Sequence, residues 1–187
     1  MLKAEFSIID ELVTKGLKRI ETEQSVSLVK VNPKEDFTFT SSLADQISLK
    51  KSNTAEVPLY MARLLFEEGM AEPVDKFLDR KTLARISSEE RYKEYRLTDV
   101  PPSFYSQLKY VLSSFRSEAD ERRASEIESL ATEMVDLRLK KILRYCRLSS
   151  IPPELSASMT SEEAHLFNLL RHIIICWKKE VIGIGGK

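Results

Sequence analysis

The sequence is poor in glycine, and this scarcity limits the chemistry that the chain can perform. Its 187 residues contain five glycines, three of which stand near the very end, at positions 183, 185 and 186. No phosphate-binding loop, dinucleotide fingerprint or nucleophile elbow can be written from Gly16, Gly69 and that terminal group. Enzymes that depend on such backbone cradles are therefore excluded.

Cysteine and histidine are equally scarce. Cys146 and Cys176 stand outside any CxxC motif or Cys/His cluster, which indicates two reduced thiols in an intracellular protein. His165 and His172 are seven residues apart without a third ligand nearby, whereas paired metal ligands on one helix usually lie about three or four residues apart. We expect no metal, no cofactor and no catalytic residues, so the chain is predicted not to be an enzyme.

Long apolar runs and an excess of either charge are also missing. Nothing approaches the ~20 consecutive apolar residues of a membrane span. The first residues carry acids at positions 5, 10 and 11 instead of the apolar stretch of a signal peptide. The 29 basic residues equal the 29 acidic ones, so no overall charge attracts the chain to nucleic acid or to membranes. The sequence predicts a soluble intracellular protein.

Residues 1–55 have the pattern of a small β-rich docking domain. Alternating β-branched and aromatic residues predict strands over 25–31, 37–40 and 46–50. Residues 5–19 fit either a short amphipathic helix ended by Gly16 or, in part, a strand. About 50 residues with a few short strands are too few for independent stability. This segment is therefore expected to dock on the rest of the chain or on a partner.

The remainder has helical periodicity and forms the second predicted domain, residues 56–180, followed by a flexible tail over 181–187. Start and stop signals divide it into six predicted helices: 58–69, 74–85, 87–96, 101–115, 118–147 and 160–177. Two of them open with a predicted capping box, Ser87 with Glu90 and Thr160 with Glu163, and Gly69 is predicted to close the first in a left-handed conformation. The predicted fold class is mainly α, a helical bundle of about six helices preceded by a small β-rich domain.

The last two predicted helices carry more apolar surface than one core requires. The final helix is apolar around most of its circumference, including Phe167, Leu170, Ile174 and Trp177. A helix of this kind is covered by neighbours on several sides. Either some of those neighbours belong to another chain, or the helix is the centre of a well-packed bundle; the sequence leaves both open.

A basic stripe marks the end of the long helix. Arg138, Lys141, Arg144 and Arg147 recur every three residues. They could hold phosphates or an acidic partner. The simpler interpretation is that a helix carries, near its C-terminus, the charges that its dipole favours. The stripe also lacks the interleaved aromatic residues of a groove that binds single-stranded nucleic acid.

Three segments together carry a family resemblance. They are Val57-Pro58-Leu59-Tyr60-Met61-Ala62, then Val100-Pro101-Pro102-Ser103-Phe104-Tyr105 with Leu108 and Leu112, and then Met134-Val135-Asp136-Leu137-Arg138-Leu139-Lys140-Lys141. In this order and spacing they resemble the helical domain of GINS complex subunits. A β-rich segment that precedes the helices is similar to the archaeal subunit corresponding to the second and third Psf subunits. The stretch 136–143 is equally similar to the opposite class, in which the helical domain comes first.

The resemblance implies a non-catalytic scaffold in DNA replication. Its expected partners are other GINS subunits, in a heterotetramer of two pairs, together with the MCM helicase and a RecJ/Cdc-type protein. The expected location is the archaeal cytoplasm near the nucleoid, or the nucleus in a eukaryote. Residues expected to join subunits or to fix helix register are Val57, Pro58, Asp136, Arg138, Lys141, Phe167, Leu170, Ile174 and Trp177. The alternative function is a DNA-binding accessory module that uses the basic stripe, with weak DNA contact. An enzyme with an unrecognised site is a third, less favoured class.

Overall fold

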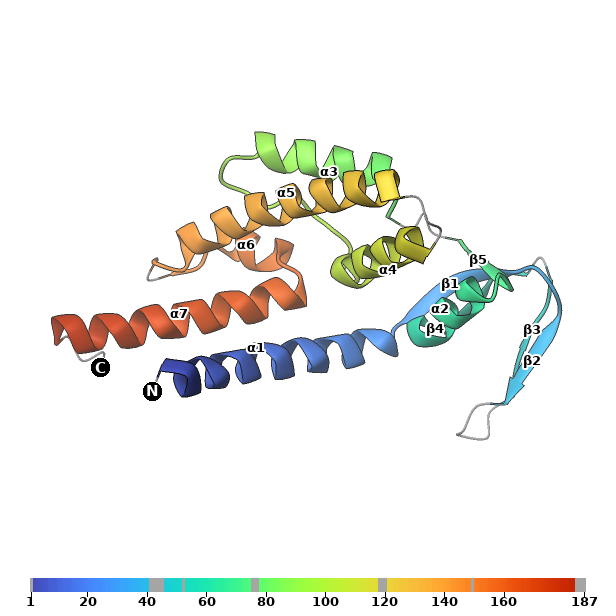
Figure 1. Ribbon diagram of the computed structural model, residues 1–187, viewed down its shortest axis with the longest axis horizontal. Helices are drawn as coiled ribbons and strands as arrows, with labels where there is room; N and C mark the ends of the chain where they lie inside the picture. Colours follow the sequence, from blue (N-terminus) through green and yellow to red (C-terminus); the bar gives the residue numbers. More distant parts are fainter. Residues whose placement is uncertain are drawn as a thin grey trace. The chain divides into compact units, whose positions relative to one another are not determined.

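The computed structural model divides into two compact units. It describes residues 2–40, 46–51, 53–74, 78–117, 121–148 and 150–183. One unit, here called the helical unit, combines Met1–Ile20 with Leu78–Lys187, and the other, the small unit, is Glu21–Phe77. Each unit is described by itself below. A mainly helical chain with a small strand-containing part near its start confirms the predicted fold class (Figure 1).

The small unit is built on a three-stranded antiparallel sheet. Strand β1 (Leu28–Pro33) lies in the middle, paired with β4 (Ala55–Pro58) on one side and β5 (Ala71–Pro73) on the other. A separate hairpin joins β2 (Phe37–Thr40) to β3 (Gln46–Leu49). Helix α2 (Leu59–Glu67) follows β4 directly. The fully buried side chains of Val31, Val57 and Ala62 form the centre of the apolar core between sheet and helix.

The residues at the two ends of α2 explain where this helix begins and ends. Pro58 occupies the N-cap position with an extended backbone, so the N–H that proline lacks would have had no helical partner. At the other end Gly69 has a φ of 69°, and its N–H donates to the carbonyl of Phe66 at 3.1 Å. The predicted left-handed glycine after the first helix is confirmed.

The helical unit is organised around one long helix. Helix α5 (Glu121–Tyr145) packs against α3 (Arg80–Tyr92), α4 (Phe104–Ser117) and α7 (Ser161–Ile182). The short helix α6 (Pro153–Ser158) precedes α7, and the first part of α1 (Leu2–Ser25) belongs to the same unit. Figure 1 shows α3 and α5 side by side. Helices α3, α4 and α7 therefore all pack against α5.

Two apolar clusters lie along α5. The cluster near its start includes Ile127 and Met134, against Phe104 of α4 and Leu83 of α3. The cluster near its end contains Ile142 and Cys146 of α5 with Leu97, Leu155 and Phe167. The turn of α5 that carries Arg138 falls between Met134 and Ile142 in the sequence, so that it lies between the two clusters. A charged residue therefore occupies the junction of two cores.

The third helix differs from the sequence prediction. Residues 74–85 and 87–96 were expected to form two helices, with Ser87 and Glu90 as a capping box, but α3 runs unbroken from Arg80 to Tyr92. Its N-cap is Asp79, whose Oδ1 accepts from the N–H of Thr82 at 2.7 Å. The predicted capping box is wrong because both of its residues are buried in the interior of the helix. The second predicted box, Thr160 with Glu163, is confirmed at the start of α7.

Of the two predicted alternatives for residues 5–19, the structure has the helix. Helix α1 passes through Gly16 without ending there. A Cβ atom at position 16 would lie 2.0 Å from Nε2 of His165, so glycine at this position permits the close approach of α1 to α7. Close packing, not helix termination, explains this glycine.

The division of the chain also differs from a boundary at residue 55. The small unit continues to Phe77 because β5 pairs with β1, and it therefore includes α2. The predicted tail 181–187 begins later, since α7 continues to Ile182 and is closed by Gly183. Residues 184–187 lie outside the described part of the chain. No described helix has both the length and the apolar character needed to cross a bilayer.

Replacement of Gly69 tests the left-handed closure of α2. No atom lies within 4 Å of the position that a Cβ would take, so the cost arises from the backbone alone. We expect Gly69→Ala to lower the free energy of unfolding by about 1 kcal/mol, and Gly69→Asn to lower it by less, because asparagine tolerates this conformation. Urea denaturation measures both. Equal stability of the wild type and the alanine variant would contradict the assignment.

Candidate functional site

The centre of the helical unit is a fully buried guanidinium group. Arg138 of α5 has no solvent exposure and forms a two-bond salt bridge with Glu163 of α7. Its Nε donates to Oε1 at 2.6 Å, and its Nη2 donates to Oε2 at 2.8 Å. Two parallel charge-assisted bonds of this kind fix both the distance and the orientation of the two side chains. The pair therefore connects α7 to α5 by two directional bonds.

The remaining donors of Arg138 reach three other segments. Nη1 donates to Oε2 of Glu90 at 3.1 Å and to the carbonyl of Thr98 at 2.7 Å. Nη2 also donates to the carbonyl of Ser158 at 3.0 Å. A guanidinium has five N–H donors, and here each has an acceptor. One side chain thus links α3, the segment after α3, the end of α6 and the start of α7 to α5.

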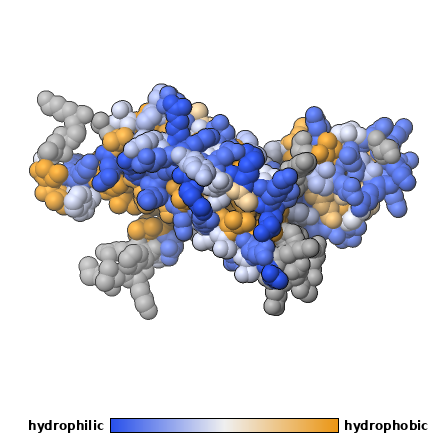
Figure 2. Space-filling model, turned by 90° about the horizontal axis from the view of Figure 1, so that it is seen from above, coloured by the Kyte–Doolittle hydropathy of each residue, from blue (hydrophilic) through white to orange (hydrophobic). Residues whose placement is uncertain are grey.

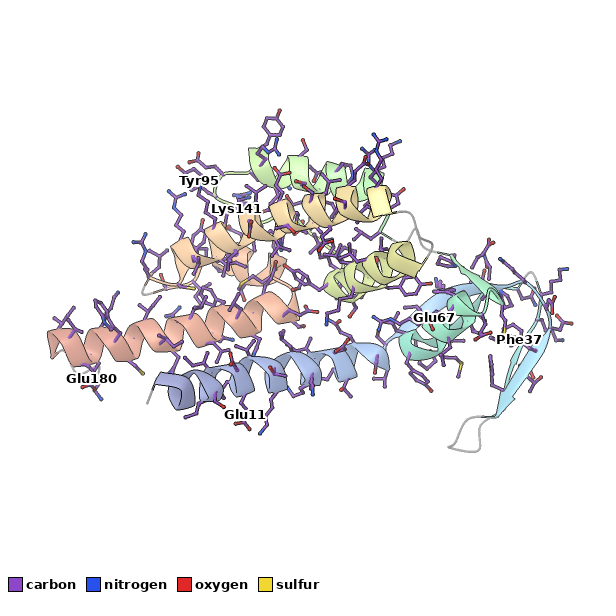
Figure 3. The ribbon with its side chains drawn as sticks, in the orientation of Figure 1. Glu11, Phe37, Glu67, Tyr95, Lys141 and Glu180 are labelled. Atoms are coloured by element: carbon purple, nitrogen blue, oxygen red, sulfur yellow. The ribbon has the colours of Figure 1, made fainter. Side chains whose placement is uncertain are left out.

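Lys141, one turn further along α5, completes the network. Its Nζ donates to Oε1 of Glu90 at 2.6 Å, to the carbonyl of Glu90 at 2.5 Å and to the carbonyl of Arg96 at 3.0 Å. Glu90 in turn accepts the backbone N–H of Thr98 on Oε2 at 2.8 Å. Figure 3 shows Lys141 next to the segment that carries Tyr95. All three ammonium donors are used, so the end of α3 and the following segment are fastened to α5.

We call Arg138, Lys141, Glu90 and Glu163 the buried charge network. Two cations face two carboxylates, so the network is neutral as a whole. Burial alone would lower the pKa of Arg138, but the hydrogen bonds and charge of Glu163, with the charge of Glu90, raise it above its ordinary value. The guanidinium of Arg138 therefore keeps its charge in the interior. Such a pair contributes little net stability, whereas removal of one partner leaves an uncompensated buried charge.

Tyr105 of α4 joins the network through its hydroxyl. The hydroxyl donates to Oε1 of Glu163 at 2.7 Å. Burial, and next the negative charge of Glu163, raise the pKa of Tyr105 far above its ordinary value. Glu163 also accepts the backbone N–H of Thr160 on Oε2 at 3.0 Å, as part of the capping box. One carboxylate thereby closes the start of α7 and binds both α4 and α5.

The residues predicted to fix helix register occupy different environments. Arg138 and Lys141 belong to the buried charge network, whereas Asp136 is exposed on α5. Val57 and Pro58 lie at the end of β4, in the small unit. Phe167 is buried in the second apolar cluster, and Leu170 and Ile174 pack against it from one side. Trp177 is exposed as well, at 60%.

The end of α7 presents an exposed apolar surface. Five large apolar side chains there are each about half exposed or more: Ile173, Ile175, Trp177, Val181 and Ile182. In Figure 2 apolar surface gathers at the end of the molecule where Figure 1 draws the end of α7. Ile173, Trp177 and Val181 recur every four residues and therefore share one side of the helix. Apolar side chains gathered on one side of a protein surface mark sites that bind a partner. We call these three residues the α7 apolar surface; Ile175 and Ile182 lie on the opposite side of the helix.

The predicted basic stripe of four residues requires correction. Arg138 and Lys141 are buried and paired with carboxylates, so they are not available to a phosphate. Arg144 and Arg147 are exposed, and the guanidinium of Arg144 lies 4.6 Å from the centre of the Tyr95 ring. Residues at a spacing of three wind around an α-helix and do not stay on one side of it. As a result, Arg138 and Lys141 lie in the core, and Arg144 and Arg147 lie at the surface.

The described residues carry little that resembles catalytic chemistry. Burial raises the pKa of the Cys146 thiol, which disfavours the reactive thiolate. Across the described ranges, no group of three or more histidine, cysteine, aspartate or glutamate side chains is placed to hold a metal ion. The charges of the network are directed at one another and at backbone carbonyls. The arrangement is suited to holding helices in place.

Sequence reasoning missed Glu90, Glu163 and Tyr105 as members of the network. Both glutamates were predicted to belong to capping boxes. This prediction is correct for Glu163 and wrong for Glu90. The cations that donate to these two carboxylates, Arg138 and Lys141, lie 25 to 51 residues away in the sequence. A buried Arg at i and a buried Lys at i+3, on an otherwise apolar helix face, is the pattern that could have indicated buried carboxylate partners.

One comparison with known proteins gives a match. A family described as Sld5, the GINS complex protein helical bundle domain, matches residues 77–182, which is more than half of the chain. The matched segment covers α3 to α7 and therefore contains the whole buried charge network. No curated protein matches the chain.

Replacement of Arg138 tests whether the network determines the stability of the helical unit. We expect Arg138→Met to lower the free energy of unfolding by about 3–5 kcal/mol, because Glu163 loses its buried countercharge. The exposed Arg144→Met is the matched control, with an expected loss of under about 1 kcal/mol. Chemical denaturation measures both. Adding Glu163→Gln to Arg138→Met should cost less than the sum of the single changes, and strict additivity would argue against direct coupling.

Alkaline pH tests the bond between Tyr105 and Glu163. The pKa of Tyr105 is higher in the folded protein than the ordinary value near 10, so its contribution is complete below pH ~10 and is lost as the pH rises further. We expect the stability advantage of wild type over Tyr105→Phe to shrink by about 1.4 kcal/mol per pH unit above pH ~10. Tyr92→Phe, at an exposed tyrosine, is the control. A constant difference from pH 9 to 11 would contradict the buried tyrosine.

Proposed function

The chain belongs to the GINS complex family of DNA replication proteins, and we propose that it acts as a non-catalytic scaffold subunit of that complex. The observation that carries this proposal is the combination of an internally satisfied core with the α7 apolar surface. A scaffold needs a fixed shape and a surface for its neighbour. The buried charge network supports the first requirement, and the exposed end of α7 supports the second.

We propose that the α7 apolar surface is covered by another GINS subunit. Apolar side chains at the centre of an interface provide most of the binding free energy when a partner removes them from water. A complete burial of one such side chain is worth about 1.5–3 kcal/mol. The structure therefore favours α7 over the exposed Asp136 as the inter-subunit contact. Phe167, Leu170 and Ile174 would support this surface from within the subunit.

The finer assignment follows the resemblance. We propose that the chain is the archaeal type of subunit that corresponds to the second and third Psf subunits, since its small unit precedes most of the helical unit in the sequence. In this assignment the complex is a heterotetramer of two pairs. It bridges the MCM helicase and a RecJ/Cdc-type protein, near the nucleoid of an archaeal cell or in the nucleus of a eukaryotic one. The small unit would provide the docking surface for one of these partners.

The DNA-binding alternative receives no support from the geometry. It depended on four basic residues acting together, and two of them, Arg138 and Lys141, form buried salt bridges with Glu163 and Glu90. Arg144 and Arg147 alone would contribute about two phosphate contacts, which is a small electrostatic term at physiological salt.

Mixing the chain with a GINS partner tests the scaffold function. Light scattering on a sizing column is expected to show a four-subunit mass of mixed composition. Trp177→Asp should abolish the mixed complex, because a carboxylate would have to be buried in an apolar interface. Tyr92→Asp is the matched control, since Tyr92 is a still more exposed aromatic residue on α3, and it should leave the complex intact. A chain whose mass does not respond to the partner would overturn the proposal.

A further inference from the structure

A shallow groove lies between the end of α3 and the second half of α5. Its volume is about 740 Å³. Three apolar side chains line it, Leu137 and Leu143 of α5 and Ile174 of α7, and every other residue of its lining is charged. None of these three is fully buried, and Leu143 is 43% exposed. We call this the α3–α5 groove, and it combines apolar surface with charge.

The charges of the groove balance only in part. Its lining contains two acids and five bases: Glu90, Glu94, Arg91, Lys140, Lys141, Arg144 and Arg147. Glu90 and Lys141 belong to the buried charge network, which is neutral as a whole, and Arg91 pairs with Glu133. Once these pairs are set aside, three bases remain against one acid, Glu94.

The three remaining bases are exposed and have no carboxylate partner within the described ranges. The side chains of Lys140 and Arg147 form no ion pair with any residue that the structure describes. The guanidinium of Arg144 lies 4.6 Å from the centre of the Tyr95 ring instead of against an acid. Their charges are therefore available to a partner.

The helix dipole accounts for part of this arrangement. It favours bases in the last turn of α5, which ends at Tyr145, and so explains Arg144. Lys140 lies more than one turn before that end, where the influence of the dipole is small. The dipole also gives no reason for apolar side chains such as Leu143 to lie exposed beside the bases.

A neighbouring hollow differs in its charge. It has a volume of about 230 Å³ and is lined in part by Tyr95, which is labelled in Figure 3. Two bases, Lys93 and Arg96, line it together with two acids, Asp99 and Glu154, so it has no net charge. Of these two hollows, the α3–α5 groove is the one with a surplus of positive charge.

We propose that the α3–α5 groove binds an acidic peptide segment of a partner protein, in which an apolar side chain stands among carboxylates. The carboxylates pair with Lys140, Arg144 and Arg147, and the apolar side chain covers Leu137 and Leu143. Clusters of basic side chains are a recurring means of recognising acidic motifs, and an apolar anchor in a hollow supplies much of the binding free energy. The groove shares no residue with the α7 apolar surface, so this proposal and the proposed subunit contact stand or fail separately.

A nucleic acid strand matches the same groove less well. Its phosphates repeat regularly, so a strand that crosses the groove brings phosphate near Glu94, whose exposed carboxylate has no ion-pair partner among the described residues. The residues that line the groove include no aromatic side chain on which a base could stack. A peptide can place its carboxylates opposite the bases and leave Glu94 unopposed.

Peptide binding by the full-length chain tests the proposal. The probes are short fluorescein-labelled peptides that alternate glutamate with serine and carry a pair of leucines or phenylalanines at each position in turn. Fluorescence anisotropy should detect binding of at least one of them, and the affinity should fall as salt is added, because exposed charge pairs are screened. Replacing the glutamates by glutamine, or the apolar pair by serine, should weaken binding by at least about tenfold.

A charge reversal in the protein locates the binding site. Lys140→Glu with Arg147→Glu reverses two bases of the groove, and it should weaken peptide binding by at least about tenfold. Lys15→Glu with Lys81→Glu makes the same change of charge at exposed positions outside the groove and should bind like the wild type. All four residues are exposed, and glutamate and lysine have similar helix propensity, so both variants should fold as judged by circular dichroism.

An apolar truncation tests the second half of the proposal. Leu143→Ala removes apolar surface from the groove and should weaken the binding of the apolar peptides by about fivefold or more. Leu148→Ala is the matched control, because Leu148 is similarly exposed, at 47%, but does not line the groove. It should leave the affinity unchanged.

Several results would overturn the proposal. They are a failure of every peptide to bind, binding that neither groove change weakens, and equally tight binding of the peptides that lack the apolar pair. An oligothymidine strand whose binding depends on Lys140 and Arg147 and exceeds that of the peptides would identify a nucleic acid as the occupant. The reversed variant should still form the mixed complex with a GINS partner; loss of that complex would identify the groove as a subunit contact instead.

Discussion

The helical unit depends on one buried cation. Arg138 has no contact with water, and its five N–H donors are distributed over Glu163, Glu90 and two backbone carbonyls. A charge in this position is tolerable when every donor has an acceptor and the nearby carboxylates balance it. The positions of α3, α4, α6 and α7 relative to α5 are therefore tied together. Movement of any one of these helices would leave a charge or a donor unmatched.

This constraint explains why the apolar core alone would not specify the bundle. Two apolar clusters on either side of Arg138 favour close packing, but apolar contact is not directional. The bond lengths of the guanidinium and carboxylate groups permit one register. The network therefore adds directional contacts to the non-directional contacts of the two clusters.

The sequence predicted individual helices and strands better than it predicted which residues they contact. The strand 37–40, the closing glycine at position 69 and the capping box at Thr160 depend on neighbouring residues, and they were correctly identified. Strands β4 and β5 were missed; both are defined by their pairing with β1, a partner that is distant in the sequence. Glu90 was assigned to a cap, because its true partners, Arg138 and Lys141, lie about 50 residues away in the chain. Arg138 itself was singled out, but which carboxylates surround it depends on tertiary packing.

The long separation between network members has a consequence for the folding pathway. Before α3, α5 and α7 are docked, each charged group is hydrated, and none gains from a partner that is not yet fixed. The network can form only once apolar contacts have brought the helices together, so it belongs to the late, native side of the transition state. Interactions of this kind have little effect on the folding rate and act by slowing unfolding. We therefore expect the buried charges of this chain to slow unfolding more than they change the folding rate.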